Sequence, residues 1–152
     1  MGADITPYAD ATYSQTYNDT FPGRDAWCAQ TSANQTKYLK VATRAIERLN
    51  FAGEKAVEAQ ELQFPRGADT LVPDDIQQAC VELAWSLFDG VDPELESENL
   101  RSVSQGVGAA RVTYAPAVFS DHVIAGIPSL RAWNLLVPYL RDPDEITISR
   151  VS

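Results

Sequence analysis

The sequence predicts a mainly α-helical fold, a bundle of four to five helices with a small β-hairpin or strand element and an extended C-terminal tail. Two long segments repeat apolar residues at the i, i+3, i+4, i+7 spacing of a helix. Shorter segments in the last third of the chain alternate apolar and polar residues as a strand does. At 152 residues the chain can bury the core of one domain, which we assign to residues 1–141, with residues 142–152 as the tail.

The N-terminal part is predicted to hold a lead-in and a weak helix. Residues 1–7 have the composition of a loose lead-in. A weak helix follows over residues 8–19, and the Pro-Gly pair at 22–23 ends it. The residues after this break, Asp25–Cys28, fit a single helical turn that places Trp27 against the core.

A clear second helix is predicted to begin at Thr31 or Ser32, either of which can cap it, and to end near Asn50. Its apolar stripe consists of Leu39, Ala42, Ile46 and Leu49. A separate basic stripe consists of Lys37, Lys40, Arg44 and Arg48. Three interpretations of the basic stripe stay open: a solvated face, an interface with an acidic neighbour, or a contact with DNA.

The next segment, residues 51–70, is predicted to connect two helices with an anchor of its own. Leu62 and Phe64 are expected to pack onto the core, while Pro65 and Gly67 bend the chain.

The chain is organised around a predicted central helix from Pro73 to Gly90. Its wide apolar stripe consists of Ile76, Ala79, Cys80, Leu83, Ala84, Leu87 and Phe88. Pro73 suits the first helical position, and Gly90 ends the helix. Val81 and Trp85 lie one turn apart on a flank outside the stripe, so we expect this helix to make a second contact. Either a third helix of the same chain or a neighbouring subunit can provide it.

The C-terminal third is predicted to combine short strands with one more helix. Residues 111–114 alternate as a strand does, and Ser129 can cap a last helix that Pro138 kinks or ends. The apolar face of that helix consists of Leu130, Trp133, Leu136 or Val137, and Leu140. The tail alternates again and is expected to add a strand to a partner. Its candidate docking residues are Arg141, Ile146, Ile148 and Arg150.

The charge is unevenly distributed along an acidic chain. The net charge is −9 and the pI is about 4.4, which argues against a protein whose main task is to grip phosphates. Residues 24–48 are basic on balance, whereas residues 54–98 are strongly acidic. Such a separation of positive and negative charge would allow the basic face of one copy to pack against the acidic face of another. The candidate inter-subunit residues are Lys37, Lys40, Arg44, Arg48, Val81, Trp85, Glu94 and Glu96.

No residue set points to catalysis, a metal or a cofactor. His122 is the only histidine, and its surroundings match no nucleophile or metal motif. Residues 92–98 begin like a calcium loop, but Ser97 and Val103 replace its required glycine and glutamate. We therefore expect no enzyme. No run approaches the roughly 18 apolar residues of a membrane span, and the first residues lack a secretion signal, so we expect a protein made in a cytoplasm.

Four segments carry a family resemblance: residues 11–17 with the isolated Trp27, residues 42–53, residues 62–66 and residues 72–84. The last three resemble the patterns "ATRxIDRLNWxG", "LQWPR" and "VPxxIxxAxxELA", and the first resembles the first helix of the same family. That family is the phage head–tail connector (adaptor, or head-completion) proteins, a closely related group of which is labelled DnaT-like single-stranded-DNA-binding protein.

This resemblance implies a structural role without chemistry. The subunit would form a homo-oligomeric ring, typically of twelve copies, beneath the portal protein in the virion neck, after synthesis in the cytoplasm of a bacterial host. Its partners would be the portal and a downstream neck or tail protein, and DNA would pass through the channel without tight binding. The alternative is a single-stranded-DNA-binding replication accessory protein, which for a chain of net charge −9 requires that the basic stripe be concentrated in one groove.

Overall fold

The computed structural model describes residues 3–91 and 121–141, and this part of the chain is mainly helical. Its α-helices are α1 (Ala11–Asn18), α2 (Asp25–Cys28), α3 (Ser32–Glu47), α4 (Asp74–Phe88), α6 (Asp121–Ile124) and α7 (Leu130–Leu136), followed by the 3-10 helix η1 (Val137–Tyr139). These six α-helices, with no strand among the described residues, confirm the mainly α class. The predicted β element at 111–114 and the extended tail at 142–152 lie outside the described residues.

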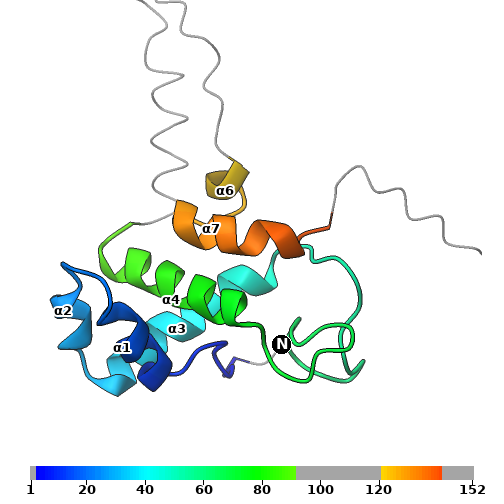
Figure 1. The fold of residues 1–152 in the computed structure, drawn as a ribbon, viewed down its shortest axis with the longest axis horizontal. Coiled ribbons are helices and arrows are strands. Elements are labelled where there is room, and N and C mark those ends of the chain that lie inside the picture. Colours follow the sequence, from blue (N-terminus) through cyan, green and yellow to red (C-terminus); the bar gives the residue numbers. More distant parts are fainter. Residues whose placement is uncertain (1–2, 92–120, 142–152) are drawn as a thin grey trace, which may run out of the picture.

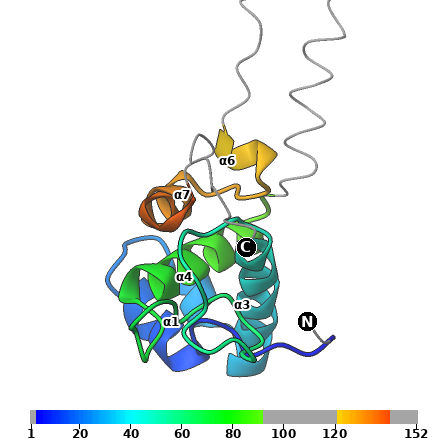
Figure 2. The same ribbon diagram turned by 90° about the vertical axis from the view of Figure 1, so that its right-hand side faces the viewer.

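Helix α4 lies at the centre of the described fold. Helices α1 and α3 pack on one side of it, and α7 crosses its other side (Figures 1 and 2). Seven residues of α4 are buried, which is more than one stripe of a helix can supply. The predicted second contact of this helix is therefore made by α7 of the same chain. Val81 is fully buried, which removes it from the predicted inter-subunit contacts, whereas Trp85 is half-buried.

The helix ends follow the predicted caps closely. The hydroxyls of Thr31 and Ser129 accept hydrogen bonds from the backbone N–H groups three residues on, as N-caps do. Helix α3 ends at Glu47, three residues before the predicted Asn50. Pro73 precedes the first residue of α4 instead of occupying its first position. The last helix ends at Leu136 and Pro138 falls in η1, in agreement with the prediction that Pro138 kinks or ends this helix.

One detail of the sequence analysis is wrong, and one short helix is missing from it. The predicted apolar face of the last helix included Leu130, which is 57% exposed because it follows the cap at the outer side of α7. The short helix α6 was not predicted, since four residues cannot show a helical period. The single turn that buries Trp27 is confirmed by α2, where the Trp27 side chain has no exposed surface.

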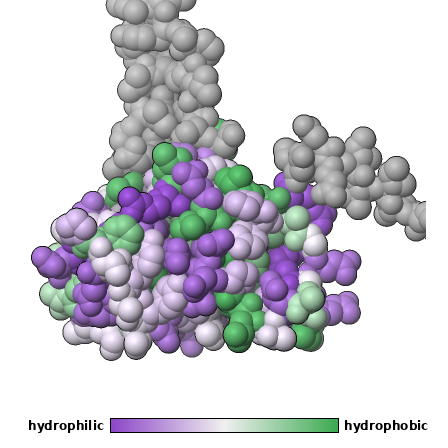
Figure 3. Space-filling model, viewed as in Figure 1, coloured by the Kyte–Doolittle hydropathy of each residue, from purple (hydrophilic) through white to green (hydrophobic). Residues whose placement is uncertain are grey.

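The connection between α3 and α4 is held by its predicted anchor. Phe64 is buried and packs edge-on against Phe51, Tyr8 and Tyr139, and Leu62 packs at the edge of the same core. The peptide bond between Phe64 and Pro65 is cis, and Gly67 takes a φ of +62°, a conformation that glycine adopts without steric cost. On the face shown in Figure 3, apolar and polar surface are interspersed, and no single apolar patch covers it.

Candidate functional site

The outer side of α3 carries the largest group of cations that share one helix face in the described structure. The α3 basic face is defined by Lys37, Lys40, Arg44 and Arg48, which recur at three- and four-residue intervals. No acidic residue occurs between residues 26 and 46. At 1.5 Å per residue the face extends over roughly 16 Å. The exposed side chain of Val41 lies on the same face.

The opposite side of α3 fixes the direction in which this face points. Leu39, Ala42 and Ile46 have no exposed surface. Buried Thr43 donates a hydrogen bond to the Leu39 carbonyl and accepts one from the backbone N–H of Tyr8. Because this side is packed against α1 and α4, the four cations must face away from the core. In the described part of the chain, Lys37 and Arg48 are exposed and have no ion-pair partner.

The other two cations of the face are contacted by the N-terminal lead-in, residues 3–7. Lys40 Nζ lies 2.6 Å from Asp4 Oδ1, and the Arg44 guanidinium donates a 2.5 Å hydrogen bond to the Ala3 carbonyl. The hydrogen bond and positive charge of Lys40 lower the pKa of the Asp4 carboxyl. The lead-in is less loose than predicted, since Ile5 is buried. A hollow of about 240 Å³ between the lead-in and Lys40 also has Glu61 in its lining.

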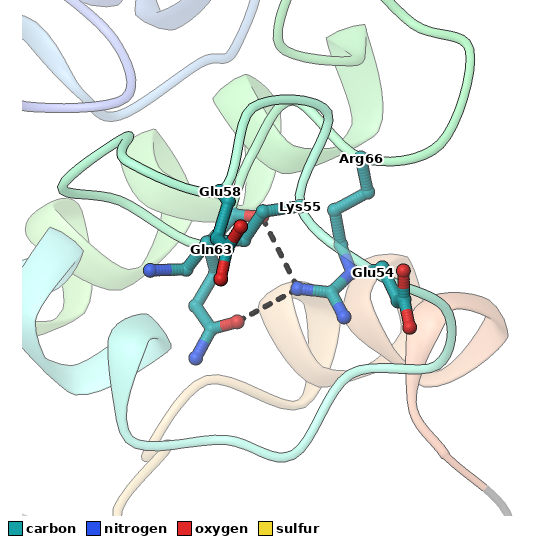
Figure 4. Close-up of a pocket in the computed structure, with 5 residues that line it drawn as sticks. All are labelled: Glu54, Lys55, Glu58, Gln63 and Arg66. Carbon is teal, nitrogen blue, oxygen red and sulfur yellow. Dashed lines mark hydrogen bonds between the residues drawn. The ribbon is translucent and has the colours of Figure 1, made fainter.

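A cleft of about 510 Å³ in the connection between α3 and α4 is a second candidate, shown in Figure 4. Its lining consists of Glu54, Lys55, Glu58, Gln63 and Arg66. The Arg66 guanidinium points to Gln63 and donates hydrogen bonds to its side chain and its carbonyl, at 2.7 and 3.2 Å. It also donates to three loop carbonyls, those of residues 51–53, so its donors are used to hold the loop. With equal numbers of acidic and basic side chains, this cleft has no excess charge to attract an anion.

A third cluster, which the sequence analysis missed, is a buried ion pair between α4 and the loop before α2. Arg24 Nη2 lies 3.0 Å from Glu82 Oε2, and both side chains are almost fully buried. The Tyr17 hydroxyl donates a 2.8 Å hydrogen bond to the same carboxylate, and exposed Arg131 of α7 lies 3.6 Å from it. Burial and the nearby Glu82 carboxylate raise the pKa of Tyr17. The signal in the sequence for this cluster was Glu82, an acidic residue within the apolar pattern of the central helix. Its contacts with Tyr17 and Arg131 join α1, α4 and α7.

The structure does not bring the remaining predicted residues into one site. Arg141 is half-buried and its backbone N–H donates to the Asn50 carbonyl. Glu94, Glu96, Ile146, Ile148 and Arg150 lie outside the described residues. His122 Nδ1 lies 2.7 Å from the carbonyl oxygen of Ile127.

Residues 3–91 and 121–141 contain neither a candidate metal site nor a helix that could span a membrane. No three side chains of the types that ligate metals come together there. No described helix is both long and apolar enough to span a bilayer. The expectation that the protein is not an enzyme stays a prediction.

Fold and site together define a small helical protein of acidic net charge that displays a row of cations on one helix. A family model described as "Putative DnaT-like ssDNA binding protein" matches residues 3–150, and the chain belongs to this family. Comparison with curated proteins and with solved structures finds no match.

The family match corrects the head–tail connector interpretation, which is wrong. Nothing found in the comparisons indicates a connector family. The predictions that depended on it are therefore wrong: a ring of copies, portal and neck partners, and DNA that passes without binding. No finding points to a location in a virion. The net charge of −9 averages over the whole chain and does not describe the local charge of the α3 basic face. Inter-subunit roles for the other predicted residues stay untested predictions.

Proposed function

We propose that this protein is a DNA-binding accessory protein that holds single-stranded DNA on the α3 basic face. The observation that carries the proposal is the gathering of Lys37, Lys40, Arg44 and Arg48 on one outward face of α3, in a chain of a family described as ssDNA binding. Lysine and arginine side chains bind phosphates and release condensed counterions, which supplies sequence-independent affinity. A row of roughly 16 Å offers contacts to a few successive phosphates.

The surroundings of this face favour phosphate contacts over base stacking. Tyr38, the aromatic residue among these cations, packs its ring edge-on against Trp27 and Phe88, at centroid distances of 5.9 and 5.7 Å. Its ring therefore belongs to the core and is not a stacking platform. The apolar surface of Val41 can contact sugars or bases between the cations. Binding is thus expected to depend strongly on salt and weakly on base sequence.

The acidic balance of the whole chain limits the affinity without preventing binding. At physiological salt, exposed charges more than about 8 Å apart are largely screened from one another. A phosphate on α3 therefore responds mainly to the cations of that face. With only four cations, the expected dissociation constant lies at the weak end of non-specific binding, about 10⁻⁴ M.

The test is the fluorescence anisotropy of a labelled oligo(dT) of about 20 nucleotides, long enough for one such site. The full chain is compared with a variant that carries Lys37→Gln and Arg48→Gln, two exposed changes that leave the core intact. Lys55→Gln, which removes one charge from the loop cleft, is the control for loss of a cation away from α3. The proposal requires weaker binding in the double variant and unchanged binding in the control. Equal loss of binding in the double variant and in the control overturns the proposal. So does the absence of binding both by the wild-type chain and by the Asp4→Ala variant described below.

A further inference from the structure

The N-terminal lead-in lies over part of the surface that the proposed function assigns to DNA. It runs from α1 across α3 toward the N-terminus, as the dark blue segment in Figure 2 shows. Its Asp4 carboxylate is paired with Lys40, and its Ala3 carbonyl accepts from Arg44. Two of the four cations of the α3 basic face are therefore already in contact with oxygen atoms of the same chain.

The lead-in is firmly attached on one side of these contacts and exposed on the other. Ile5 is 2% exposed, and the backbone N–H of Tyr8 donates a 3.0 Å hydrogen bond to Thr43 of α3. Ala3 and Asp4 are exposed, and the Asp4 side chain has 90% of its surface open to solvent. Ala3 and Asp4 can therefore leave α3 by a rotation near Ile5 while the buried part of the lead-in stays in place.

We propose that the lead-in is a built-in competitor for phosphate, in which the Asp4 carboxylate and the Ala3 carbonyl occupy phosphate-oxygen positions on Lys40 and Arg44. This inference rests on the proposed function of the α3 basic face. DNA first meets the free ends of the face, Lys37 and Arg48, and then displaces residues 3 and 4 to reach its centre. The affinity of the wild-type chain for DNA is therefore lower than the affinity that the α3 basic face would have without the lead-in.

The strength of the contacts suits a competitor that DNA can displace. An ion pair between exposed side chains is weak because water and salt screen it, so its loss changes a binding constant by at most about fivefold. A phosphate offers more acceptor oxygens than the single carbonyl of Ala3, and arginine can bind two of them at once. Exchange of the lead-in for a phosphate therefore keeps an anion on Lys40 and replaces the uncharged carbonyl acceptor on Arg44 with an anionic one.

A double-mutant cycle on Asp4 and Lys40 tests the competition directly. We expect Asp4→Ala to bind oligo(dT) about two- to fivefold more tightly than wild type, since a single exposed ion pair is removed. In the Lys40→Ala background the same change is expected to have no effect, because the cation that Asp4 occupies is gone. The gain should disappear as salt rises, because both the ion pair and the phosphate contacts are screened.

A charge-matched control separates local competition from the change in net charge. Asp89→Ala removes one exposed carboxylate beyond the end of α4 and should leave the affinity unchanged. Equal gains from Asp4→Ala and Asp89→Ala, or a gain from Asp4→Ala that persists without Lys40, overturn the inference. The inference is also overturned if Asp4→Ala binds like wild type. In that case the proposed function still holds provided that loss of Lys37 and Arg48 weakens binding. If Asp4→Ala binds oligo(dT) and the wild-type chain does not, the competition is supported. If neither the wild-type chain nor Asp4→Ala binds, both proposals fall.

Discussion

Glu82→Gln is expected to destabilise the fold strongly, because it leaves the Arg24 guanidinium buried without a counter-charge. The side chains of Arg24 and Glu82 are 9% and 2% exposed, and they meet at 3.0 Å. Removal of one partner of a buried ion pair costs about 3–5 kcal/mol. Glutamine keeps one acceptor for the Tyr17 hydroxyl, so we expect the lower end, about 3 kcal/mol. For a chain of this size that corresponds to a fall in Tm of roughly 6–12 °C.

The same carboxylate supplies its own control. Arg131 lies 3.6 Å from Glu82, but its side chain is 56% exposed, so Arg131→Gln should cost less than about 1 kcal/mol. Urea denaturation followed by circular dichroism measures both variants, with unchanged m-values as the condition for comparison. Similar free energies of unfolding for Glu82→Gln and wild type, or a larger loss in Arg131→Gln, would refute the reasoning from burial.

Three further predictions concern helix capping, core packing and thiol reactivity. Ser129→Ala removes the side chain that accepts from the Ala132 N–H and should lower the free energy of unfolding by about 1 kcal/mol; no change in a urea titration would contradict this role of the cap. Leu39→Ala should cost about 2–5 kcal/mol in the same assay because Leu39 is fully buried in the core, and a cost below that range would place it outside the core. Burial raises the pKa of the Cys80 thiol to about 11, so at pH 8 it stays protonated, and a maleimide should modify it only after unfolding. Rapid labelling of Cys80 in the native protein would show that the site opens.

The long elements were predictable because their physical signals are local and repeat several times. The apolar residues of α3 and α4 recur at helical spacing over about three turns each, and Thr31 and Ser129 are cap residues of ordinary type. The four-residue helix α6 has no such period. A second apolar flank on α4 was visible in Val81 and Trp85, but the sequence could not decide between α7 and another subunit, since both bury the same surface.

The residues of the candidate site could be predicted from the sequence, but the contacts that two of them make with the N-terminal lead-in could not. The spacing of the α3 cations places them on one face, and only the structure shows that residues 3 and 4 contact two of them, across a separation of 36 residues for Asp4 and Lys40. Single long-range ion pairs leave no periodic trace. Arg24 and Glu82, 58 residues apart, were missed for the same reason.

The salt dependence of oligo(dT) binding by the full chain tests the central claim most directly. If the α3 basic face holds the strand with four cations, the logarithm of the binding constant should fall with the logarithm of salt concentration with a slope of about −3. The variant with Lys37→Gln and Arg48→Gln should show a slope about half as steep. A slope near zero, or the same slope in wild type and this variant, would contradict the assignment of DNA binding to α3.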